Sequence, residues 1–257
     1  MQIGNREVGG GFPMMLVAEL SANHSGSLKR ARQLVKHAAS AGADAIKLQT
    51  FRPKELAVLR GGGQAPPPWE AYTLEALYEE AQTPWEWHAE LFGLARELGM
   101  LAFSSTFSAE STAFLLDLGV PCLKVSAFEW GHFHEFGIPL GVSLICSVRS
   151  PIEVPPGGGG ENVAFLYCPP GYPPNCSNMN LRRIIGLPKE SVVGLSDHSL
   201  CIYTPLMARA LGASILEVHL MLDEGEYDTP PLDAAFSWRP EPFMQLVRSI
   251  RHAELTL

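Results

Sequence analysis

Polar side chains recur two residues apart at the ends of several short apolar runs. The set comprises Lys47 and Gln49, Lys124 and Ser126, Ser196 and His198, Glu217 and His219, and Glu19 with Asn23 and His24 in the loop after it. Residues two apart on a strand face the same way, and a buried charge is costly unless it is paired or liganded. Any one of these residues alone fits an ordinary surface or core position. Their repetition at successive run ends predicts one shared functional site.

Two histidines and two lysines in this set indicate a particular chemistry. His198 and His219 lie on neighbouring runs with carboxylates nearby, which suits a divalent transition metal such as manganese. Lys47 and Lys124 have no carboxylate beside them in their own runs, which suits binding of a phosphate or carboxylate anion. Together these residues predict a metal-assisted reaction on an anionic substrate.

The elements that would position these residues are short apolar runs that alternate with helical patterns. The predicted strands are 14–20, 45–50, 100–106, 122–127, 140–146, 163–168, 192–198 and 214–220. The predicted helices are 27–41, a stretch from Pro84 to about residue 98, 109–118, a short one near 180–185, about 203–211, and 240–254. Such alternation favours a parallel sheet with crossover helices.

Eight strands in one chain of 257 residues predict an α/β fold, a single-domain (β/α)₈ TIM barrel over residues 1–257. The alternative is a doubly wound open sheet, but that fold would usually carry a glycine-rich phosphate motif after the first strand, and SANHSGS is not one. In a barrel the active site forms at the carboxyl ends of the strands, where the polar pairs lie.

Two crossovers of this barrel are expected to be thin or to lack a helix. Only a short helical turn fits between the fourth and fifth strands, and the segment SVRSPIEVPPGGGG after the fifth strand cannot form a regular helix. The wall around 151–160 is therefore either uncovered or covered by another subunit. Residues 52–82 form a long polar insert, which contains GGGQAPPP.

Composition excludes several classes of protein. Hydrophobic residues make up 46% of the chain and charged residues 18%, enough apolar material for a core, and the net charge of −8 disfavours nucleic acid and anionic membranes as partners. The run 12–20 is too short to cross a membrane and contains Pro13 and Glu19. The five cysteines form no CxxC pair, which indicates reduced thiols. We therefore expect a cytoplasmic protein.

Longer motifs resemble a known family. The segment VAELSANHSGSLKRARQLVKHAASAGADAIKLQTF (17–51) resembles the opening of the sialic acid synthase family, and LSANH and LYEEAQTPWEWH (77–88) are most similar to its pseudaminic acid synthase branch. Further similar motifs, in family order, are AFSSTF, GVPCLKVSAFE, GLSDHS, GASILEVH and LDAAFSWRPEPF. Together they cover nearly the whole chain, and the set is far more specific than any one motif.

The resemblance implies a phosphoenolpyruvate-dependent condensation with an N-acetylated amino-sugar aldehyde, which gives a nine-carbon nonulosonic acid and phosphate. It implies catalytic roles for Glu19, Lys47, Gln49, Lys124 and Glu217, substrate binding by Ser143, Tyr172, Ser196 and Asp233, and metal binding by His198 and His219. Manganese is the expected metal, with magnesium and cobalt as alternatives.

The sequence departs from the family pattern at several positions. The family usually carries a C-terminal antifreeze-like domain whose arginine covers the partner's substrate, whereas this sequence ends at Leu257 after the last predicted helix. We therefore expect no such domain, and a homodimer or a separate capping protein as partner. The family's Ser-Thr-Gly-Met strand end is matched here to 143–146, of which only Ser143 agrees. Ala127 and Pro170 replace polar residues, and each lost donor would cost about 1–3 kcal/mol.

Two alternatives follow from these departures. The chain could be a related phosphoenolpyruvate enzyme that uses another sugar. It could also be a catalytically weakened barrel that serves as a binding or scaffold subunit, although a scaffold has no physical need for the costly charged cluster.

Overall fold

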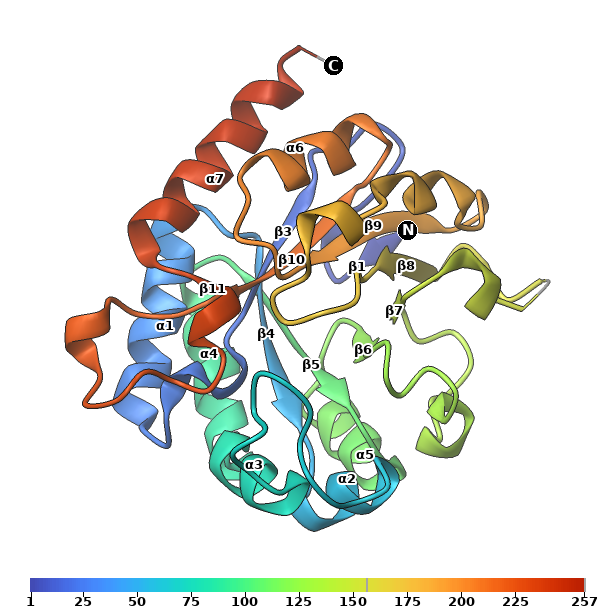
Figure 1. Cartoon of the computed structure of the whole chain (residues 1–257). Coiled ribbons are helices and arrows are strands. Elements are labelled where there is room, and N and C mark those ends of the chain that lie inside the picture. The colour runs from blue at the N-terminus through green and yellow to red at the C-terminus, as the bar shows by residue number, and fades with distance from the viewer. Residues whose placement is uncertain (156, 257) are drawn as a thin grey trace.

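The barrel wall consists of parallel strands that close on themselves (Figure 1). The computed structural model describes residues 1–155 and 157–256. Within them the barrel strands are β3 (Met15–Glu19), β4 (Ala45–Thr50), β5 (Leu101–Thr106), β6 (Leu123–Val125), β7 (Leu144–Val148), β8 (Val163–Tyr167), β9 (Val192–Asp197) and β10 (Ile215–Leu220). Each pairs with the next, and β10 pairs with both β9 and β3. The predicted (β/α)₈ barrel is confirmed.

The fifth strand begins later than predicted. Leu140 is fully exposed in a turn that is closed by the Val142 amide donating to the Pro139 carbonyl, and β7 starts only at Leu144. Gly141 has a φ of 86°, a conformation that breaks the extended run. Because β7 starts four residues later than predicted, Ser147 and not Ser143 lies near the carboxyl end of the strand.

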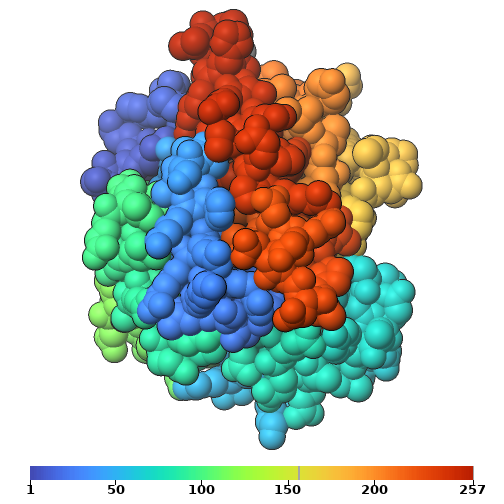
Figure 2. All heavy atoms as spheres, turned by 90° about the vertical axis from the view of Figure 1, so that its left-hand side faces the viewer, coloured from blue at the N-terminus to red at the C-terminus, as the bar shows by residue number. Residues whose placement is uncertain are grey.

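Most of the predicted helices are present. They are α1 (Leu28–Ala41), α4 (His88–Glu97), α5 (Ala109–Asp117), α6 (Tyr203–Ala210) and α7 (Pro240–Glu254). The Ser27 side chain caps α1 by accepting from the Arg30 amide, and Gly42 ends it with a φ of 89°. The first helix lies between α4 and α7, and Figure 2 shows α1 in blue beside α7 in red.

One side of the barrel has a thin cover. The crossovers after β6 and β7 contain only the 3₁₀ turns Phe133–Phe136 and Pro151–Glu153 within the described residues. The crossover after β8 likewise has only 3₁₀ turns, at Cys176–Asn178 and Leu181–Gly186, so the helix predicted near 180–185 is a 3₁₀ helix. The prediction of thin or missing helices after the fourth and fifth strands is confirmed.

The insert 52–82 contains two helices that the polar character of its sequence does not predict. They are α2 (Pro53–Leu59) and α3 (Leu74–Ala81), which pack on each other at the carboxyl end of the strands (Figure 1). Phe51, Leu56, Leu77 and Phe107 belong to a small core of their own beneath the insert. The insert is thus a packed roof over one end of the barrel.

The opposite end is closed by the N-terminal hairpin. Strands β1 (Gln2–Ile3) and β2 (Arg6–Glu7) pair antiparallel, and Ile3 and Val8 pack against Met15 and other residues in the barrel interior. A short strand β11 (Ser237–Trp238) extends the sheet beside the end of β10. In the described part of the chain no helix has the length and apolar character needed to cross a membrane.

Candidate active site

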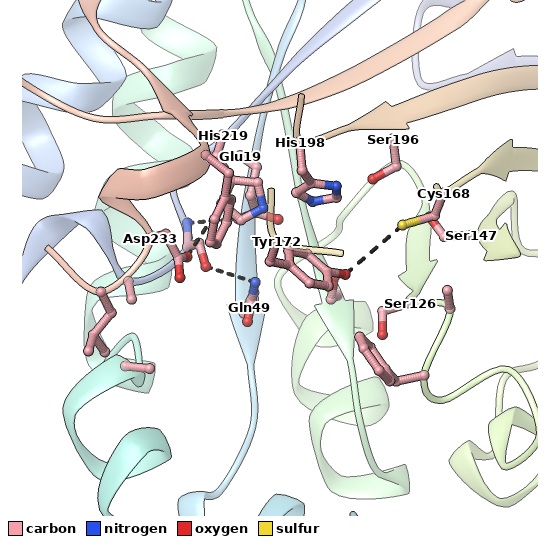
Figure 3. A pocket seen from close by; sticks show the side chains of 18 of the residues that line it. Glu19, Gln49, Ser126, Ser147, Cys168, Tyr172, Ser196, His198, His219 and Asp233 are labelled. Atoms are coloured by element: carbon pink, nitrogen blue, oxygen red, sulfur yellow. Dashed lines mark hydrogen bonds and ion pairs between the residues drawn. The ribbon is translucent and has the colours of Figure 1, made fainter. Parts of the chain in front are cut away.

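A cavity of about 400 Å³ opens at the carboxyl ends of the strands, beneath the insert. Ten of the eleven residues predicted for the site line it. They are Glu19, Lys47, Gln49, Lys124, Tyr172, Ser196, His198, Glu217, His219 and Asp233. Figure 3 shows several of these side chains arranged around a common space, from Asp233 and His219 through His198 to Ser196. The closed barrel and its loops thus gather residues as distant in the sequence as Glu19 and Asp233, which are 214 positions apart (233 − 19).

Lys47 lies between two buried carboxylates. Its Nζ is 2.5 Å from Oε2 of Glu19 and 3.0 Å from Oε1 of Glu217. The pairing of β3 with β4 places Glu19 directly beside Lys47. Burial acts to lower the pKa of Lys47, but the two carboxylates outweigh it and the pKa is raised. Lys47 therefore stays charged and is balanced by two carboxylates. Its own run has no carboxylate, as the sequence shows, but Glu19 and Glu217 come from other strands.

Lys124 has a different environment. Its Nζ donates to the Ser147 hydroxyl at 2.7 Å and to the Val125 carbonyl at 2.8 Å, and its side chain is almost completely buried. Among the described residues no carboxylate lies within ion-pair distance of it, and burial lowers the pKa of Lys124. A buried cation without a counterion favours an anionic ligand at this position.

Ser143, predicted to bind substrate, does not reach the cavity. It precedes β7, and its hydroxyl donates to the Gln2 carbonyl at the hairpin end of the barrel. The prediction is wrong because the strand starts four residues later than the apolar pattern indicates. Ser147 occupies the place at the mouth instead, where it lines the cavity and contacts Lys124.

The two histidines lie side by side. The rings of His198 and His219 have centroids 5.0 Å apart, and Nδ1 of His219 is 3.4 Å from Oδ2 of Asp233. Burial lowers the pKa of His198 well below its ordinary value, helped by the neighbouring His219. Nδ1 of each ring is buried without a hydrogen-bond partner in the described structure. Two neighbouring imidazoles with unused ring nitrogens suit metal binding.

Hydrogen bonds hold the remaining polar residues in place. Ser196 donates to Oε1 of Glu217 at 3.1 Å, and Gln49 donates to the Ser21 hydroxyl at 2.9 Å. The Ser21 amide in turn donates to Oε1 of Glu19. These bonds join the loop after β3 to β4, and join β9 to β10. They keep the orientation of the Glu19 and Glu217 carboxylates before any ligand binds.

Asn23 and His24, which follow Glu19 in the polar set, lie outside the cavity lining. The side-chain amide of Asn23 donates to the Leu220 carbonyl and the Ser237 hydroxyl. Nε2 of His24 is 3.2 Å from the Thr83 hydroxyl. Burial lowers the pKa of His24 to about 4. Both residues pack the first loop against its neighbours. Their place in the chain beside Glu19 is not enough to bring them to the site.

Several residues of the cavity are not predicted by the sequence pattern. They are Ser105, Ser147, Arg60, Arg149, Trp69 and Phe236. Ser105 could have been found, since its alternation along AFSSTF places it inward, 3.3 Å from Lys47. The cavity also contains Ala127 and Pro170, which offer no side-chain donor. The two changes from the family pattern therefore lie within the site.

Comparison with known proteins identifies the family. The NeuB family matches residues 34–257. The chain belongs to the NeuB family. It is 37% identical to pseudaminic acid synthase of Campylobacter jejuni over the whole chain and 78% of that protein. It is 33% identical to N,N'-diacetyllegionaminic acid synthase of Legionella pneumophila, over 99% of the chain and 76% of that protein.

A solved structure agrees with this assignment. The N-acetylneuraminic acid synthetase of Leptospira borgpetersenii superposes with a TM-score of 0.85 at 26% identity, covering the whole chain and 89% of that structure. The predicted family, its TIM-barrel fold and its class of nonulosonic acid synthases are confirmed.

Proposed function

We propose that this NeuB-family chain condenses phosphoenolpyruvate with an N-acetylated amino-sugar aldehyde to form a nonulosonic acid of the pseudaminic or sialic type, with release of phosphate. The observation that carries the proposal is Lys124, a buried cation without a carboxylate partner in the described structure. It shares one cavity with the paired histidines and the Glu19–Lys47–Glu217 cluster. An anion and a carbonyl compound can therefore meet in this space.

The phosphoenolpyruvate anion is proposed to bind at the Lys124 end. Lys124 would supply a charged donor, and the hydroxyls of Ser147 and Ser196 neutral ones, all lining the same cavity. Charge-assisted hydrogen bonds are about twice as strong as neutral ones, so Lys124 would contribute the largest part. Lys47 contacts Ser105 and the carboxylates of Glu19 and Glu217. We therefore propose that Lys47 orients these carboxylates and lies beside the bound anion.

His198 and His219 are proposed to hold a divalent metal, manganese first and magnesium or cobalt next. The unused Nδ1 atoms and the low pKa of His198 fit such a role, because a neutral imidazole can donate its lone pair. In the described residues no group of three or more histidine, cysteine or carboxylate side chains is arranged as a metal site. The protein would thus supply two nitrogen donors, and water and substrate oxygens would complete the set. When bound, the metal would supply Lewis-acid polarisation of the aldehyde carbonyl.

The acceptor sugar is proposed to lie between the histidines and Gln49. Asp233 and Glu19 would accept hydrogen bonds from its hydroxyls, and Tyr172, whose ring centroid is 4.6 Å from that of His198, would close one side. C3 of phosphoenolpyruvate then attacks the aldehyde carbon to form the new carbon–carbon bond. Water adds to C2, and the C2–O bond to phosphate breaks. The contribution of these side chains is orientation and charge stabilisation.

The remaining assignments concern partners and place. The substrates are small molecules, and no nucleic acid or membrane is part of the proposal. We keep the homodimer and the separate capping protein as candidate partners, since the wall between β7 and β9 has only 3₁₀ turns in the described chain. The five free cysteines fit a reducing compartment, and we propose the cytoplasm.

The direct test measures phosphate release. The protein would be incubated with manganese, phosphoenolpyruvate and a panel of amino-sugar aldehydes, with a chelator-treated sample as control. We expect release with at least one sugar and little release after chelation. Absence of release with every sugar, together with absence of phosphoenolpyruvate binding by calorimetry, would favour the scaffold alternative.

A further inference from the structure

Trp69 lies in the insert at a point where the insert meets the cavity. The chain turns tightly there, with the Trp69 amide donating to the Pro66 carbonyl and the Tyr72 amide donating to the Trp69 carbonyl. The indole Nε1 donates to the Leu232 carbonyl at 2.9 Å, next to Asp233. In Figure 2 the cyan insert adjoins the orange segment that contains these residues. Trp69 thus connects the roof to the loop that carries Asp233.

The ring of Trp69 belongs to an aromatic wall on the histidine side of the cavity. Its centroid is 5.8 Å from that of Tyr172 and 5.8 Å from that of Phe236. Phe236 in turn lies 4.9 Å from His219 and 5.6 Å from His198. The part of a ligand that extends from the histidines toward the insert would therefore meet Trp69.

The roof differs in chemistry from the strand ends. The insert lines the cavity with apolar or aromatic residues and one cation, Arg60, which pairs with Glu129. The apolar lining residues include Leu56, Trp69, Leu74, Leu77 and Tyr78. An acceptor that reacts as an open-chain aldehyde has no flat sugar ring to stack. Its main apolar parts are the methyl ends of its acyl groups, which gain free energy when they are buried against such a wall.

We propose that Trp69 determines acceptor specificity by packing against an N-acyl group of the sugar while its indole N–H fixes the segment that carries Asp233. This inference rests on the proposed function, because it requires an N-acylated acceptor. It assigns recognition of the acyl group to the insert, and binding of the phosphoenolpyruvate anion to the strand ends.

The test compares two acceptors in three variants. The acceptors are the N-acetyl sugar that the wild type uses best and its N-butanoyl analogue. In Trp69→Ala we expect kcat/KM for the N-acetyl sugar to fall about 10- to 100-fold, mainly through KM, because a lost apolar contact has effects of this size. The N-butanoyl sugar fills the space left by the ring, so the ratio between the two acceptors should shift about tenfold toward it.

Trp69→Phe keeps a ring but loses the N–H, and we expect an intermediate effect. Trp130→Phe is the matched control, since its indole donates to the Glu153 carbonyl at 2.8 Å and stacks on Phe133, yet Trp130 does not line the cavity. This control variant should leave kcat/KM for both acceptors unchanged. An unchanged acceptor ratio in Trp69→Ala would overturn the inference, since a merely structural role lowers both activities equally.

A second readout does not need turnover or the alanine variant. Acceptor added without phosphoenolpyruvate should change the tryptophan fluorescence of the wild type and of Trp130→Phe, and this change should be largely lost in Trp69→Phe. An undiminished change in Trp69→Phe would contradict the inference. Failure of the proposed function is distinct, because the wild type itself would then show no phosphate release.

Discussion

Two neighbouring positions in the cavity carry the same side chain in different electrostatic settings. Lys47 is held by Glu19 and Glu217, whereas Lys124 contacts only a hydroxyl and a carbonyl in the described structure. Both lysines are buried near the carboxyl ends of their strands. Position on a strand therefore does not decide the role of a charged residue. Cross-strand neighbours decide whether the charge supports the fold or remains available to a ligand.

The largest expected effect concerns Lys47 and its two carboxylate partners. Lys47→Met leaves two carboxylates buried without their cation, and we expect the free energy of unfolding to fall by about 3–5 kcal/mol. Denaturant unfolding measures this. Adding Glu217→Gln to the variant should recover part of the loss. If Lys47→Met unfolds at the same denaturant concentration as the wild type, the cluster is not the electrostatic unit described above.

The histidines form a further part of the site at the ends of β9 and β10, and a His219 variant tests whether this part binds a metal. His219→Ala removes one of the two proposed nitrogen donors, so we expect manganese affinity to fall at least about 100-fold and turnover to be lost. Calorimetric titration with manganese measures the affinity. His24→Ala is a control outside the cavity lining, and it should leave manganese affinity unchanged. Unchanged affinity in His219→Ala would contradict the ligand assignment.

A smaller effect on phosphoenolpyruvate binding should distinguish Ser147, on β7, from Ser143, just before β7. Ser147→Ala removes a neutral donor beside Lys124, and we expect phosphoenolpyruvate affinity to fall about 5- to 10-fold, the size of one net hydrogen bond. Ser143→Ala is the matched control, because its hydroxyl contacts Gln2 at the hairpin end. Equal losses in the two variants would show that the difference between their positions has no bearing on binding.

Much of this molecule could be predicted from sequence, and the failures have physical causes. Strand β4 and helices α1 and α7 agree closely with their patterns, because burial of one face dominates their local preference. The start of β7 was predicted four residues too early, because Leu140 and Val142 fit a strand pattern although Leu140 is exposed in a turn. Because of that error, Ser143 was predicted at the mouth of the barrel, although it lies at the opposite end.

The site residues show the same limit. Lys47, Lys124 and both histidines could be placed at one rim, since parallel strands end together. The partners of Lys47 could not be predicted, because they depend on pairing between β3, β4 and β10. The insert was unpredictable for another reason. Its glycines and prolines mask two short helices, and Trp69 reaches the cavity only through contact with a segment 163 residues later.

Phosphoenolpyruvate binding to Lys124→Met tests whether this buried lysine holds the anion. The variant removes a buried charge that has no carboxylate partner, so its stability should equal or exceed that of the wild type, which denaturant unfolding checks. Calorimetry should then show phosphoenolpyruvate affinity reduced about 10- to 100-fold, since a charge-assisted contact is lost. A folded Lys124→Met protein that binds phosphoenolpyruvate as tightly as the wild type would show that Lys124 does not hold the anion.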